Sequence, residues 1–177
     1  MKKTYVMPLL VLTLICLVVS AALAFTDSVT SPLVADAAAA RAQEAMIEKI
    51  PDADGFEPID LSNTPGLPVS IREIYRTTNG VGYIFIAAVN GFSGDITVIC
   101  GVAPDGTIID SSTLSHTETR GIGTILEEAS FLDTFNGVDD RLVGVDTVAG
   151  ATISTRAYIH AISDILAAFK LVSAQVN

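Results

Sequence analysis

The feature that most constrains this chain is an apolar run near its start. Tyr5 to Phe25 holds 21 residues and no charged side chain. As a helix this run spans about 31 Å, close to the hydrocarbon thickness of a bilayer. Lys2 and Lys3 precede the run and Asp27 follows it, a charge asymmetry that is typical of a cytoplasmic N-terminus. The sequence therefore predicts a cytoplasmic start and a transmembrane helix over residues 1–25, with the rest of the chain on the outer side of the cell (inner) membrane.

A cleaved signal peptide is the alternative for the same segment. Ala22-Leu23-Ala24 fits the small-residue pattern of a cleavage site. The apolar run is, however, longer than the roughly 7–15 residues of a signal-peptide core, which favours a retained anchor. Cys16 lies inside the run among apolar neighbours, which is typical of a small buried residue rather than of a lipid-attachment site.

The charge of the remaining chain restricts its partners. The sequence has 10 basic and 20 acidic residues, and without Lys2 and Lys3 the 8 remaining basic residues leave a formal charge of −12. This charge argues against nucleic acid and anionic lipid headgroups as partners, so contact with membrane lipid is expected only of the anchor. Cys100 is the one cysteine left, and His116 and His160 are the only histidines. We therefore expect no internal disulfide and no metal site.

A stalk helix is predicted between the apolar run and a folded domain. Residues 26–50 include an alanine-rich segment of high helix propensity. Pro32 allows a bend in the stalk, and Pro51 ends the helix. Residues 51–70 are rich in Pro, Asp, Asn and Gly, a composition that predicts connecting loop with one short strand. Three apolar residues near the end of the stalk are expected to dock on the domain: Met46, Ile47 and Ile50.

The domain, residues 51–177, is predicted to have an α+β fold. Runs of β-branched and aromatic residues alternate with turn signals such as Asn79-Gly80 and Pro104-Asp105-Gly106. Short turns between strands indicate an antiparallel sheet. A short helix over 126–135 and a C-terminal helix that begins near Thr152 accompany the sheet. The four predicted strands are residues 71–77, 82–90, 95–103 and 107–114.

The segment from Asp146 to Thr155 combines glycine with a cluster of hydroxyl side chains at the start of the last predicted helix. Ser and Thr gather at helix N-termini because a side-chain oxygen accepts a free backbone N–H. The same helix end also binds anions. In one interpretation Thr152 or Ser154 only caps the helix. In the other, Gly150 and Ala151 leave room for a phosphate at Thr152.

A second polar segment directly follows the fourth predicted strand and ends in Gly-x-Gly. Glycines in such a loop permit close approach of the backbone to a ligand. A plain surface turn with a chance histidine is the alternative. The segment reads His116, Thr117, Glu118, Thr119, Arg120, Gly121, Ile122 and Gly123.

Together the two segments resemble the FMN-binding domain shared by the G subunit of the Rnf electron-transport complex and the C subunit of the sodium-pumping NADH:quinone oxidoreductase. That family carries Asp-x-x-(Ser/Thr)-Gly-Ala-Thr, which matches residues 146–152 here. It also carries His-x-Glu-Thr-Pro-Gly-Leu-Gly, which matches residues 116–123. The N-terminal span and Gly82-Tyr83 extend the resemblance over nearly the whole chain. The short chain and the sequence of its span favour the Rnf branch.

The resemblance implies covalently bound FMN. In the family a flavin transferase attaches FMN through its phosphate to the last threonine of the first motif, which here is Thr152. Three positions depart from the family pattern: Ala149 replaces Ser or Thr, Arg120 replaces Pro, and Ile122 replaces Leu. Arg120 adds a cation near the expected flavin. The implied cofactor-binding set comprises Thr152, Gly150, Ala151, Asp146, Ser154, Thr155, His116, Glu118, Thr119, Gly121 and Gly123.

The function that the resemblance implies is an electron relay. The chain would be a membrane-anchored flavoprotein component of an ion-translocating ferredoxin:NAD oxidoreductase complex, with the other subunits as its partners. The sequence offers no nucleophile–base pair, so we expect no catalysis by this chain alone. Two alternatives remain: a stand-alone, membrane-tethered FMN electron carrier, and a flavin-free extracytoplasmic interaction module in which Thr152 is only a helix cap.

Overall fold

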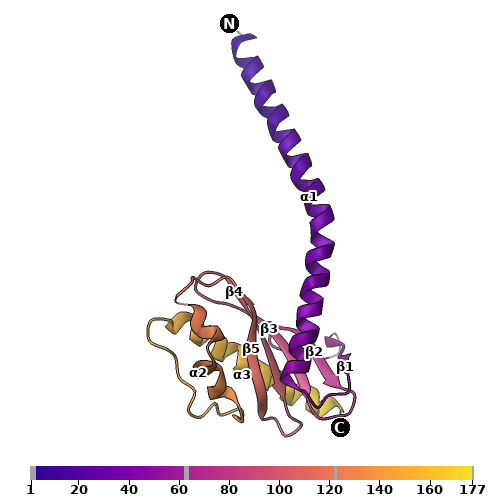
Figure 1. The fold of residues 1–177 in the computed structure, drawn as a ribbon, viewed down its shortest axis with the longest axis vertical. Coiled ribbons are helices and arrows are strands. Elements are labelled where there is room, and N and C mark those ends of the chain that lie inside the picture. The colour runs from indigo at the N-terminus through magenta and orange to yellow at the C-terminus, as the bar shows by residue number, and fades with distance from the viewer. Residues whose placement is uncertain (1–2, 62–63, 122, 177) are drawn as a thin grey trace. The chain divides into compact units, whose positions relative to one another are not determined.

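The computed structural model describes residues 3–61, 64–121 and 123–176. The chain divides into two compact units, Met1–Arg41 and Ala42–Asn177. Within its described residues the first unit is helical, and the second contains a sheet with helices (Figure 1).

The helix α1 (Lys3–Lys49) contains the predicted anchor and continues through Pro32. Its Met7–Ser31 part, with a mean hydropathy of 2.7, is long and apolar enough to cross a membrane. The stalk predicted over 26–50 is therefore the second half of the same helix, which ends just before Pro51 as expected. Lys2, one of the two lysines from which a cytoplasmic N-terminus was predicted, lies outside the described residues.

Five antiparallel strands form one sheet in the order β1-β2-β3-β4-β5. The α+β prediction is confirmed, and the four predicted strands are found with ends that differ by at most two residues. The fifth, β1, is the short strand expected within 51–70. The strands are β1 (Phe56–Pro58), β2 (Ile71–Thr77), β3 (Tyr83–Asn90), β4 (Asp95–Val102) and β5 (Ile108–His116).

The sheet buries apolar side chains on both faces. On β4, Val98 and Cys100 belong to one buried cluster and Ile99 to another, because successive side chains of a strand point to opposite faces. The helix α3 (Thr152–Val176) packs on the first cluster, and Figure 1 shows it behind the strands. Length and composition would also allow α3 to span a membrane. Its buried residues, which include Tyr158, instead make it the core helix of the domain.

The end of α1 covers the second cluster. Met46 and Ile50 are buried in it, whereas Ile47 is 55% exposed, so docking is confirmed for two of the three predicted residues. Lys49 is buried as well, and its Nζ donates to Asp110 Oδ2 at 2.7 Å. The domain therefore includes the last two turns of α1, and its compact unit begins at Ala42 rather than at residue 51.

The continuous helix predicted over 126–135 is wrong. The segment forms η2 (Gly123–Glu127), the four-residue helix α2 (Ala129–Leu132) and η3 (Asp133–Phe135). Glu128 has an extended backbone (φ −80°, ψ 127°), which interrupts the helical hydrogen bonds. The apolar spacing therefore indicated correctly which residues are buried, but it did not predict that the helix is interrupted. The buried residues of this segment are Leu126, Phe131 and Phe135.

Candidate functional site

The helix α3 begins at Thr152, so the predicted hydroxyl lies in the first helical turn. The Ala151 carbonyl accepts the first helical hydrogen bond, from the Thr155 amide at 2.9 Å. The amides of Thr152, Ile153 and Ser154 consequently have no acceptor within the helix. Thr152 itself is exposed. The helix thus presents three amides beside a solvent-accessible hydroxyl, an arrangement that favours an anion.

Capping is the wrong interpretation of Thr152 and Ser154. Thr152 Oγ1 makes a long contact, 3.4 Å, to the Val148 carbonyl oxygen, and Ser154 Oγ donates to Glu118. Both hydroxyls therefore act as donors in the part of the chain that the structure describes, and neither accepts a helix N–H there. Thr155 instead ties the helix to the preceding turn, because its buried Oγ1 accepts the Val148 amide at 3.2 Å.

That turn depends on Gly150. The Ala151 amide donates to the Val148 carbonyl at 3.1 Å, and Gly150 at the third position of the turn has φ 87°. Glycine adopts this conformation at little cost, whereas other residues are strained in it. A Cβ added at Gly150 would meet no atom within 4 Å. Gly150 therefore shapes the turn and leaves open space next to Thr152.

Glu118 connects the β3–β4 turn to α3. Its side chain is buried, with 7% exposed. Its Oε1 accepts the amides of Phe92 at 2.7 Å and Ser93 at 3.1 Å, both in the turn between β3 and β4. Its Oε2 accepts the Ser154 hydroxyl at 2.6 Å. One carboxylate therefore holds two segments that are far apart in the sequence.

The same contacts keep Glu118 ionised. Burial opposes ionisation, but the hydrogen bonds from Ser154, Ser93 and Phe92 outweigh it. The pKa of Glu118 is therefore held below its ordinary value.

Two glycines make room for this carboxylate. A Cβ at Gly91 would lie 2.1 Å from Glu118 Oε1, and a Cβ at Gly123 would lie 2.0 Å from Glu118 Cβ. Gly123, a predicted site residue, thus serves to seat Glu118. Gly121 has φ 88° and open space around it, so its role is to turn the chain.

His116 is the last residue of β5, whereas the sequence predicted it to be the first residue of the loop that follows. Its Nδ1 accepts the Glu118 amide at 3.1 Å, so in the neutral ring Nε2 carries the proton and donates to Glu127 Oε1 at 3.0 Å. Thr119 Oγ1 lies 3.1 Å from Ser93 Oγ. Both side chains fix the course of the backbone around Glu118.

A cleft of about 270 Å³ opens between the β3–β4 turn and the start of α3. Two large apolar side chains stand exposed at it, Phe92 by 63% and Ile153 by 56%. Helix amides and a hydroxyl suit a phosphate, and apolar walls suit an aromatic ring, so the residues fit a phosphorylated cofactor such as FMN. The cleft is lined by Phe92, Gly150, Ala151, Thr152, Ile153 and Ser154.

Several predicted residues lie outside this lining. Asp146 is exposed, and its Oδ1 accepts the Thr147 amide at 2.7 Å, the contact of a turn-forming aspartate. Arg120 is exposed and does not line the cleft. Ile122 lies outside the described residues. Among the residues that the structure describes, no group of three or more His, Cys, Asp or Glu side chains is placed to hold a metal ion.

Two lining residues, Ile153 and Phe92, were not among the predicted site residues. Phe92 is the one that lies far from the Thr152 motif in the sequence. It occupies a four-residue turn, Gly91 to Gly94, in which solvent ordinarily favours polar side chains. A bulky aromatic residue in a turn with glycine at both ends is the sequence feature that could have identified Phe92 as a site residue.

Comparison with known proteins defines the class of the domain. Residues 91–167 match the family model described as FMN-binding domain. The matched segment starts at Gly91 in the β3–β4 turn and includes Glu118 and Thr152, so it contains both sides of the cleft.

Relatives identify the family more closely. The chain is 31% identical over 157 residues to the G subunit of the ion-translocating oxidoreductase complex of Methanosarcina acetivorans, with 82% of this chain and 84% of the relative covered. It is 26% identical over 166 residues to the G subunit of the proton-translocating ferredoxin:NAD(+) oxidoreductase complex of Clostridium ljungdahlii, with 86% and 85% covered. The crystal structure of Shewanella oneidensis NqrC is similar with a TM-score of 0.46 and 21% identity, over 55% of this chain and 60% of that one. The chain belongs to the family formed by the G subunits of ion-translocating oxidoreductase complexes.

Proposed function

We propose that this chain carries FMN, esterified through its phosphate to Thr152 Oγ1, and relays electrons within an ion-translocating ferredoxin:NAD oxidoreductase complex. The observation that carries the proposal is the cleft at the start of α3. There an exposed Thr152 hydroxyl lies beside amides without helical acceptors, inside the segment that matches the FMN-binding domain. Bound FMN would supply the redox chemistry, and the chain would supply position and electrostatics.

The residues of the site have separable roles in this proposal. The first amides of α3 and the helix dipole stabilise the negative charge that a phosphodiester retains. Gly150 leaves space where the cofactor departs from the helix. Glu118, Ser154 and Thr155 hold the two sides of the cleft in place through the contacts described above.

The proposed topology rests on the apolar part of α1. The Met7–Ser31 part of α1 would contact membrane lipid, and the basic N-terminus would lie in the cytoplasm. The FMN domain would then face the extracytoplasmic side, where a flavin transferase attaches the cofactor. Covalent attachment suits that location, because FMN lost outside the cytoplasm is not readily replaced. The remaining partners are the other subunits of the complex.

Flavin fluorescence on a denaturing gel tests the attachment. The full chain, expressed with a flavin transferase, should give a fluorescent band, and Thr152→Val should abolish it. Thr124→Val is the matched control, because Thr124 is also exposed but lies outside the cleft. A wild-type chain without fluorescence, or a Thr152→Val chain that keeps it, would contradict the proposal. Co-purification with the other subunits separates a member of the complex from a stand-alone carrier.

A further inference from the structure

Two hollows adjoin the β3–β4 turn. The first is the cleft that Phe92 and Thr152 line. The second, of about 530 Å³, lies along the same helix, since it includes Ala157, one helical turn beyond Ile153. A ring system attached at Thr152 could therefore bind in either of the two hollows.

The chemistry of the two hollows differs. The cleft presents the exposed Phe92 and Ile153 side chains. The second hollow is lined by charged side chains as well as apolar ones, and in it Asp164 accepts the Ser70 hydroxyl at 2.5 Å. An aromatic ring gains more from packing on an apolar or aromatic wall than from displacing water around charges. The cleft is the better fit for a flavin ring.

We propose that Phe92 packs against the isoalloxazine ring and that Glu118 is the positioning residue that holds Phe92 there. The inference rests on the proposed FMN ester at Thr152. Glu118 Oε1 binds the amides of Phe92 and Ser93, and its Oε2 binds Ser154, two residues beyond the attachment point. A single buried carboxylate thus sets the separation between the aromatic wall and the phosphate ester.

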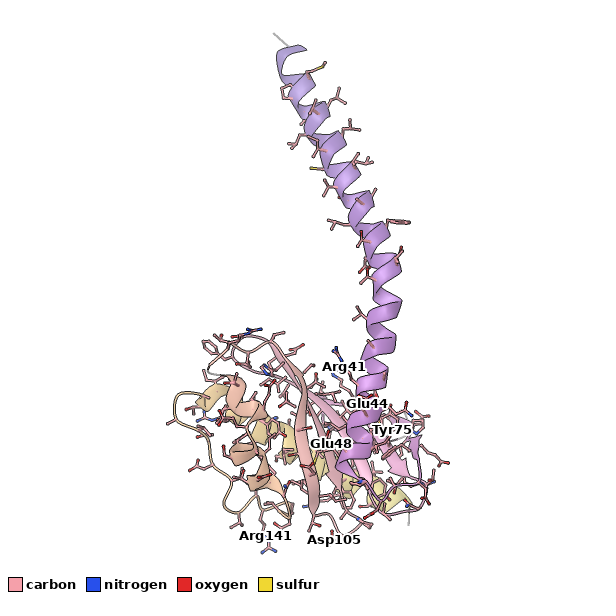
Figure 2. All side chains as sticks on the ribbon, viewed as in Figure 1. Arg41, Glu44, Glu48, Tyr75, Asp105 and Arg141 are labelled. Carbon is pink, nitrogen blue, oxygen red and sulfur yellow. The ribbon has the colours of Figure 1, made fainter. Side chains whose placement is uncertain are left out.

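Tryptophan substitution tests the placement of the ring, because an indole in contact with a flavin quenches flavin fluorescence. In the flavinylated full chain, Phe92→Trp should lose most of the fluorescence per bound flavin, with flavin counted by absorbance. Val143→Trp is the control: Val143 is 75% exposed and lines neither hollow. Arg141, two residues before Val143, lies near Asp105 at the lower end of the domain in Figure 2. The β3–β4 turn lies at the upper end of the domain in Figure 1.

The outcomes separate this inference from the proposed function. Bound flavin that Phe92→Trp leaves as bright as Val143→Trp would overturn the inference alone. Quenching by His160→Trp, in the second hollow, without quenching by Phe92→Trp would also overturn it, because the ring would then lie there. A wild-type chain without covalent flavin would overturn the proposed function itself.

The positioning role is tested in the Phe92→Trp chain. Glu118→Ala should restore much of the fluorescence, because the turn loses both of its amide contacts. Glu118→Gln should keep the quenching, since its amide oxygen still accepts those N–H groups. Ser154→Ala is a milder variant that removes only the hydrogen bond to Oε2 and should restore fluorescence partly. Unchanged quenching in both Glu118→Ala and Ser154→Ala would overturn the role of Glu118.

Discussion

Glu118 makes the stability of the domain depend on pH. Its pKa is lower in the folded chain than in the unfolded chain, so its carboxylate stabilises the fold above the unfolded-state pKa. This contribution is lost as the pH falls through the folded-state pKa. We expect the free energy of unfolding of the wild type to exceed that of Glu118→Gln at pH 7 and the difference to shrink toward pH 3. Urea unfolding across this range measures it, and a constant difference would contradict the assignment.

Replacing Glu118 by alanine should lower the free energy of unfolding at pH 7 by about 1–3 kcal/mol, because the buried Ser154 hydroxyl and two turn amides lose their acceptor. Glu127→Ala is a suitable control, since Glu127 is exposed and its side chain contacts the His116 ring at 3.0 Å. If the two substitutions lowered the free energy of unfolding equally, the buried hydrogen bonds of Glu118 would contribute no more to stability than the exposed contact of Glu127.

Gly150 lines the cleft and has a positive backbone φ. Gly150→Ala should cost about 1 kcal/mol of stability through its φ of 87°, although the added Cβ meets no atom. Flavinylation should persist if the turn keeps its shape. Gly55→Ala is the matched control, because Gly55 lacks a positive φ. Thermal unfolding together with gel fluorescence distinguishes strain from lost attachment.

Ala149 departs from the family motif but lies where a hydroxyl can be added. It is exposed in the turn that Gly150 shapes and does not line the cleft. We expect Ala149→Ser to leave flavin labelling at or above the wild-type level. A time course of gel fluorescence with the transferase present measures this, and a clear loss of labelling would contradict this interpretation of Ala149.

Among the elements, the end of α1 is part of the folded domain and not a linker to it. A chain that begins at Ala42 retains Met46, Lys49 and Ile50, whereas one that begins at Pro51 exposes the second apolar cluster and leaves Asp110 without Lys49. The shorter chain should be less stable by an amount on the order of 5 kcal/mol. Chemical unfolding of the two chains measures the difference, and equal stability would contradict the role of these two turns.

At the scale of the whole molecule, the native cysteines allow a clean test of topology. Cys100 is fully buried, and burial raises the pKa of its thiol, so it should not react in the folded domain. Cys16 lies within the candidate membrane span. Val143→Cys adds an exposed thiol, which a membrane-impermeant maleimide should label in intact cells. Labelling only after lysis would place the domain in the cytoplasm.

Local sequence patterns were sufficient for most of the elements. The strands from Ile71 to His116 follow from β-branched runs and from turn residues such as Asn79-Gly80, and these signals act over a few residues. The start of α3 at Thr152 follows likewise from apolar spacing after a glycine. The prediction of one continuous helix over 126–135 was wrong, although Leu126, Phe131 and Phe135 are buried. The spacing of apolar residues indicates which side chains are buried, but it does not fix the backbone conformation between them.

By itself the sequence determined the apolar N-terminal helix, the antiparallel sheet and the motif that ends at Thr152, because each depends on neighbours along the chain. Only the tertiary structure decided what surrounds that threonine. Phe92, Glu118 and Ser154 are distant in sequence, and their meeting depends on the strand order and on how α3 packs across the sheet. A carboxylate that serves as a bridge looks the same in the sequence as one that faces solvent. Its role becomes visible only when both of its oxygens have partners.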